Sequence, residues 1–130
     1  MKKLQLFLIL VLCLICVGQA AAFSMYDQTS NRVLGTIYQN TTGSTLTVSV
    51  TMATANTAFD LLLTINPTVF TVGPGPWTSG GTIVDHKWVP ANLNAGQSTT
   101  VGGIVPPGYY YGVSYIVGAP GYLNHWIEWY

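Results

Sequence analysis

Between residues 23 and 130, many stretches alternate between apolar and polar positions with a period of two, and no stretch keeps the roughly 3.6-residue period of a helix. The clearest alternation runs over residues 44–53, where Leu, Val and Met fall on one face and Thr and Ser on the other. This pattern is typical of an antiparallel strand with one buried face. It predicts an all-β domain.

Seven further short runs have the same character and are separated by Gly, Pro and Asn. They are 32–39, 58–65, 68–72, 82–84 with 87–89, 97–105, 109–117 and 123–129. The Asn-Thr-Thr-Gly segment at 40–43 predicts a hairpin between the strands on either side of it, because Asn and Gly accept positive φ angles. About eight short strands favour a sandwich or a small barrel. We expect an antiparallel, jelly-roll-like β-sandwich.

The first 22 residues have a different composition. Lys2 and Lys3 precede an almost wholly aliphatic run at 4–17, and small residues follow at 20–22. These are the three parts of a secretory signal peptide, here an expected signal helix. The run is shorter than the about 20 residues that span a bilayer, so we expect cleavage after Ala22. The alternative is an uncleaved segment that anchors the domain to a membrane.

Cleavage would leave a single domain at 23–130, either secreted or held at the cell surface or in the periplasm. That domain would carry two bases and four acids, a net charge of −2, and neither Cys13 nor Cys16. Without a surplus of Lys and Arg it lacks the footprint of a nucleic-acid-binding protein. So few charges favour contact with copies of itself.

Four motifs occur in an order that resembles a known family. They are Ile37-Tyr38-Gln39-Asn40-Thr41-Thr42-Gly43, an alternating Thr/Val strand, Ile104-Val105-Pro106-Pro107-Gly108-Tyr109-Tyr110 and Trp126-Ile127-Glu128-Trp129. Over residues 35–130 the chain is similar to a small β-rich domain of tailed-phage and prophage proteins, found alone on the virion or at the C-terminus of tail fibres. The resemblance implies a trimeric or otherwise oligomeric domain for virion decoration or host contact. The signal peptide departs from this family, whose members assemble in the cytoplasm.

Aromatic side chains near the C-terminus are the expected subunit interface. Alternation places Tyr109 and Tyr111 on one face of a strand, and it places Trp126 and Trp129 on opposite faces of the last strand. Whichever face meets solvent, at least one large ring is then exposed. We therefore expect these four residues to contact further copies of the chain, in a homotrimer or a filament.

Two tryptophans lie in segments that are typical of ligand-binding loops on a β scaffold. Trp77 follows Gly-Pro-Gly-Pro, and Trp88 follows Asp-His-Lys. Because indole rings beside hydrogen-bonding groups stack on sugar rings, we expect Trp77, His86 and Trp88 to bind a cell-surface polysaccharide or receptor. The competing interpretation places both indoles at the ends of the core.

Catalytic chemistry finds little support in the sequence. There is no Gly-x-Ser-x-Gly motif around a nucleophile, and nothing selects Asp60 and Glu128 as a glycosidase pair. Asp85 and His86 point to opposite faces of a strand and belong to no metal set. We expect no enzyme activity, no cofactor and no metal. Asn40-Thr41-Thr42 fits a glycosylation sequon, which we interpret as turn chemistry.

These patterns together predict an exported, non-enzymatic structural or surface-binding protein of phage-fibre type. Each copy would contribute a weak aromatic contact with a surface glycan or receptor, and several copies would multiply it. The alternative is a pilin-like fimbrial subunit that forms filaments by strand donation. The polar segment at 23–31 and the absence of a cysteine pair beyond the signal count against that alternative.

Overall fold

The computed structural model describes residues 24–53, 57–71, 80–89, 97–116 and 121–130. The predicted signal peptide at 1–22 and Trp77 both lie outside the described residues. No helix in the described ranges is long and apolar enough to cross a membrane.

The described chain forms eight strands, which confirms the predicted all-β class. The strands are β1 (Met25–Asp27), β2 (Ile37–Gln39), β3 (Leu46–Ala53), β4 (Phe59–Asn66), β5 (Thr82–Val89), β6 (Ser98–Val105), β7 (Tyr110–Ile116) and β8 (Leu123–Trp129).

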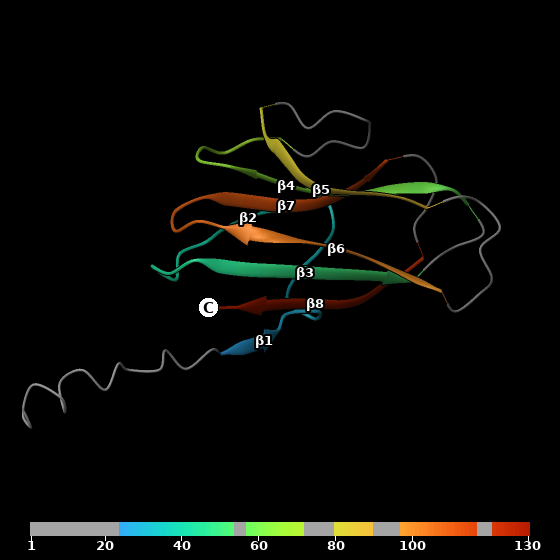
Figure 1. The fold of residues 1–130 in the computed structure, drawn as a ribbon, viewed down its shortest axis with the longest axis horizontal. Coiled ribbons are helices and arrows are strands. Elements are labelled where there is room, and N and C mark those ends of the chain that lie inside the picture. Colours follow the sequence, from blue (N-terminus) through green and yellow to red (C-terminus); the bar gives the residue numbers. More distant parts are fainter. Residues whose placement is uncertain (1–23, 54–56, 72–79, 90–96, 117–120) are drawn as a thin grey trace, which may run out of the picture.

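The strands form two four-stranded antiparallel sheets that pack face to face as a β-sandwich (Figure 1). Sheet A has the strand order β1-β8-β3-β6, and sheet B has the order β2-β7-β4-β5. Four antiparallel pairs are nested along the chain: β1 with β8, β2 with β7, β3 with β6 and β4 with β5. This nesting is the strand order of a jelly roll, in which a long antiparallel ribbon is wrapped into two sheets.

The core lies between the sheets and is built by the predicted alternation. In β3 the apolar positions Leu46, Val48, Val50 and Met52 are buried, while the Thr and Ser between them keep partial access to solvent. Sheet B supplies Phe59, Leu61, Leu63, Tyr111 and Val113, and β8 supplies Trp126. Burial of these side chains is the main favourable term for folding in a domain of this kind.

The predicted hairpin at 40–43 is wrong. β2 pairs with β7 in sheet B and β3 pairs with β6 and β8 in sheet A, so the segment between β2 and β3 carries the chain from one sheet to the other. Asn40 holds this corner. It is buried, and its side-chain amide donates hydrogen bonds to the carbonyl oxygens of Ser44, Val105 and Pro106.

Two connections that are far apart in the sequence meet at this corner: the one between β2 and β3 and the one between β6 and β7. The backbone amide of Gly108 donates to the Asn40 carbonyl at 2.9 Å, and the Asn40 amide donates to the Tyr109 carbonyl at 2.9 Å. Gly108 has a φ of 78°, a conformation that favours glycine. The Thr42 hydroxyl donates to the Asn40 side-chain oxygen, so the sequon residues serve the turn, as predicted.

Other strand boundaries differ from the predicted ones in four places. Of the predicted strand at 32–39 only β2 forms, because the chain turns just before it, where the Thr36 amide donates to the Val33 carbonyl. Residues 82–84 and 87–89 belong to one strand, β5, whose pairing with β4 shifts register between Leu63 and Thr64. Of the predicted strand at 68–72, only an isolated bridge at Thr71 occurs in the described part. β1 was not predicted, because its three residues are too few to show a period.

Candidate functional site

His86 and Trp88 lie on the outer face of sheet B, near one end of β5. Residues two apart in a strand point to the same side of a sheet, and Trp88 is paired with Asp60 of β4. Asp60 sits between Phe59 and Leu61, which both point into the core, so its own side chain points outward. The Trp88 indole remains 58% exposed. We call Asp60, His86 and Trp88 the Trp88 face.

A hydrogen bond joins two members of this face. His86 Nε2 lies 2.5 Å from Asp60 Oδ1, and the His86 side chain is half exposed while that of Asp60 is mostly covered. Because a carboxylate oxygen only accepts hydrogen bonds, the proton lies on Nε2 of the imidazole. The pair fixes both side chains beside the indole.

The surroundings of the Trp88 face on the same sheet are apolar. Leu62 lies opposite His86, and Ile116 of β7 lies opposite Asp60; both are buried. Further along the sheet Thr64 is fully covered, and a Cβ added to Gly81 would lie 2.3 Å from its methyl carbon. The sheet is therefore closed at the Thr64 end and accessible at the Trp88 end.

Asp85 and Lys87, the two other charged residues of β5, stabilise the contact between the two sheets. Asp85 Oδ2 accepts a hydrogen bond of 2.9 Å from the backbone amide of Gly102 in β6, and Lys87 Nζ lies 3.6 Å from Asp85 Oδ1. This bond closes the edge of sheet A onto the edge of sheet B. A side chain pointing inward from an edge strand also protects it from pairing with other chains.

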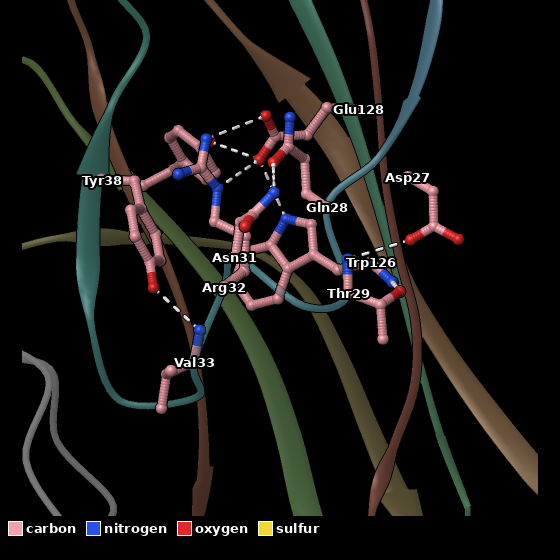
Figure 2. Close-up of polar contacts among 10 residues, drawn as sticks. Asp27, Gln28, Thr29, Asn31, Arg32, Val33, Tyr38, Trp126 and Glu128 are labelled. Carbon is pink, nitrogen blue, oxygen red and sulfur yellow. Dashed lines mark hydrogen bonds and ion pairs between the residues drawn. The ribbon is translucent and has the colours of Figure 1, made fainter.

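A second polar cluster lies inside the sandwich and is centred on Glu128 of β8 (Figure 2). The Glu128 carboxylate is buried and accepts two hydrogen bonds from the Arg32 guanidinium, at 2.9 and 3.0 Å. It also accepts bonds from the Tyr111 hydroxyl at 2.6 Å and from the Trp126 indole at 3.0 Å. These four hydrogen bonds satisfy both oxygens of the buried side chain, and those from the charged guanidinium are the stronger kind.

Arg32 reaches Glu128 from the segment that links β1 to β2, and its guanidinium lies 4.2 Å from the centre of the Tyr38 ring (Figure 2). Partial burial lowers the pKa of Arg32, but its hydrogen bonds to Glu128, together with the electrostatic attraction of Tyr111 and Glu128, outweigh this and raise the pKa above the ordinary value. Burial, assisted by the bond to Glu128, raises the pKa of the Tyr111 phenol, which therefore stays a neutral donor. The cluster ties three segments together and offers no side chain free to react.

The structure corrects part of the predicted subunit interface. Tyr111 and Trp126 have no exposed surface because they fill the core and bond to Glu128, so neither is available to a neighbouring chain. Tyr109 is half-buried and packs against the core. Trp129, also half-buried, points outward from sheet A, since it lies opposite Thr47 and Met25.

Sequence reasoning found two members of the Trp88 face and missed the third. His86 and Trp88 share a face because they are two residues apart in a strand. Asp60 joins them only through the pairing of β4 with β5, which the local sequence does not contain. The one available signal was the outward position of Asp60 in the alternating run at 58–65.

Among the residues that the structure describes, no group of three or more His, Cys, Asp or Glu side chains could hold a metal ion. Comparison of the chain with protein-family models, with curated proteins and with solved structures gives no match. The class of protein is therefore defined by its fold and its surface: a jelly-roll β-sandwich with an exposed aromatic and acidic face.

Proposed function

We propose that this chain is an exported, non-enzymatic β-sandwich protein that binds a cell-surface glycan through the Trp88 face. The observation that carries the proposal is an indole ring, 58% exposed, beside the hydrogen-bonded pair of His86 and Asp60. One side of a pyranose ring is apolar and stacks on an aromatic face. Its hydroxyl groups donate hydrogen bonds to carboxylate oxygens, the chemistry that Asp60 brings to this face.

The charge of this face favours a neutral glycan over an acidic one. Asp60 is a carboxylate that pairs, among the described residues, with His86, which is charged only when protonated. An anionic sugar would be repelled by Asp60 and would find no Lys or Arg side chain on the Trp88 face. The ligand class that fits is a neutral hexose or a polysaccharide built from one.

Display in several copies supports this function. A single stacked ring gives a weak contact, and linked copies convert weak contacts into firm attachment. The resemblance to the phage-fibre type of domain points to the same mode of action. Jelly rolls occur among viral capsid and lectin domains, although fold alone does not assign function.

Glycan arrays followed by calorimetry test the proposal. We expect the protein to bind neutral glycans and Trp88→Ala to weaken the affinity at least about tenfold, which corresponds to about 1.4 kcal/mol of lost stacking. Val69→Ala is the control, since Val69 is 67% exposed and follows the Asn66 end of β4, whereas Asp60 lies near the other end of that strand. Unchanged binding in Trp88→Ala would contradict the proposed site.

A pilin-like subunit is the alternative function. It requires a sheet edge that accepts a strand from the next subunit. Beyond its pairing with β1, the edge of β8 is bonded to the chain itself: Trp126 accepts from the Gln28 amide at 2.7 Å and donates to the Thr29 hydroxyl at 2.9 Å. Negative-stain microscopy separates the two functions, because only a pilin-like subunit forms open-ended filaments.

A further inference from the structure

We infer that the outer face of sheet A is the surface on which a second copy of this chain docks. The inference rests on the proposed multi-copy display and names the surface that brings it about. This surface also replaces Tyr111 and Trp126 of the predicted interface, which are buried in the core.

Strand register places an apolar row across all four strands of this sheet. Each residue of this row is paired with the next one across the sheet, in the order Met25 of β1, Trp129 of β8, Thr47 of β3 and Ile104 of β6. Met25 is 65% exposed and Ile104 is 62% exposed, and the two end residues flank the half-buried Trp129. We call these four residues the Trp129 row.

Beyond the Trp129 row, the part of this face on β3 and β6 is small and hydroxylated, and Asp27 of β1 with His125 and Ile127 of β8 lies beside it. Ser49 and Thr51 follow Thr47 along β3, and Thr51 shares a hydrogen bond of 2.8 Å with Thr100 of β6. Opposite Ser49 lies Gly102, which has no side chain. Hydroxyl groups both donate and accept hydrogen bonds, so such a face is complementary to an identical one.

The low charge of the outer face of sheet A also favours a second copy of the chain as its partner. Arg32 and Lys87, the cationic Lys and Arg side chains of the described residues, lie elsewhere, paired with Glu128 and Asp85. Within the described ranges, the outer face of sheet A holds Asp27 and His125 as its acid and imidazole; hydrogen bonds to Thr29, and to a smaller extent the attraction of His125, lower the pKa of Asp27. A second copy therefore meets no cationic patch and little like charge, whereas a strongly charged partner would find nothing to pair with.

The size of the face sets the strength of the contact. Three strands of seven or eight residues and the short β1, at about 4.8 Å between strands and about 3.3 Å per residue, cover a flat area of about 400 Å². A standard interface buries about 800 Å² per partner. Even with the relief of the side chains the contact is at the small end, so we expect reversible, two-fold symmetric association.

Analytical ultracentrifugation across the micromolar range tests this surface in the absence of any glycan. We expect the mass of the full chain to rise with concentration from that of a monomer to that of a dimer. Ile104→Lys should raise the dissociation constant at least about tenfold, because two lysines would be brought into the apolar row. Ile83→Lys is the matched control: Ile83 is 46% exposed, but on the edge strand of sheet B.

Met25→Lys repeats the test at the other end of the row, and circular dichroism verifies that each variant is folded. A monomer at every concentration would overturn the inference. So would association that Ile83→Lys disrupts and Ile104→Lys leaves intact. A failure of the glycan proposal is separable, because binding to the Trp88 face is measured on single copies of Ile104→Lys.

Discussion

Glu128 shows at the scale of one residue how this domain accommodates a buried charge. Its carboxylate is 3% exposed, yet both oxygens are bonded to groups from three different segments. Replacing such a group is costly because the partners stay behind, buried and unpaired. The side chain therefore stabilises the arrangement of its neighbours more than it contributes by itself.

Glu128→Gln removes the charge and keeps the size of this side chain. We expect the free energy of unfolding to fall by about 3 kcal/mol, the lower end for a broken buried pair, because Arg32 keeps some contact with water. Urea denaturation measures the loss. Asp27→Asn, which changes an exposed carboxylate in the same way, should leave stability nearly unchanged. Equal effects of the two substitutions would contradict the role given to the cluster.

The same cluster marks a limit of prediction from sequence at this scale. The alternation in 123–129 correctly separates Trp126 and Glu128 from Ile127 and Trp129, but it does not say which pair is inside. Because Glu128 is charged, one would expect its side of the strand to face solvent. That expectation fails because Arg32, nearly a hundred residues away in sequence, supplies the opposite charge inside the sandwich. Likewise Asp60 joins the Trp88 face through a strand pairing that no local pattern encodes.

At the scale of elements, the period of the longer strands was predictable, but the strand that each one pairs with was not. The run at 44–53 has the residues of a strand in any antiparallel sheet, and β3 forms where it was expected. A turn rich in Asn and Gly suits both a hairpin and a crossing between sheets. The choice is made by Asn40, whose amide bonds reach Val105 and Pro106 in a distant part of the chain.

Asn40→Asp tests this corner. Aspartate keeps the oxygen that accepts from Thr42, but it replaces the amide donor with a carboxylate oxygen facing three carbonyl oxygens at 2.8 to 3.2 Å. We expect a loss of about 3 kcal/mol of unfolding free energy in urea denaturation.

Gln39→Glu is the matched control for this change. It alters the same chemical group one residue earlier, where the Gln39 amide donates to the Gly108 carbonyl at the surface. There water replaces the lost bond, and we expect an effect of less than about 1 kcal/mol. A similar loss in both variants would show that the corner depends on its backbone bonds alone.

At the scale of the whole molecule, the few charges outside the predicted signal are largely used within the chain. Glu128 is paired with Arg32, Asp85 contacts Lys87 and a backbone amide, and Asp60 bonds His86. The remaining acid, Asp27, lies on the outer face of sheet A. The two outer faces thus differ: sheet B presents an indole with an acidic pair, and sheet A presents hydroxyls and an apolar row.

This division predicts how salt affects self-association. An interface held by opposite charges weakens as ions screen it, whereas one formed by apolar and hydroxyl groups does not. Because the Trp129 row and its neighbours include no Lys or Arg, we expect the dissociation constant of the dimer to change by less than about twofold between about 0.05 M and about 0.5 M sodium chloride. Sedimentation equilibrium at the two salt concentrations measures it. A tenfold weakening would show that the contact depends on opposite charges and not on the Trp129 row.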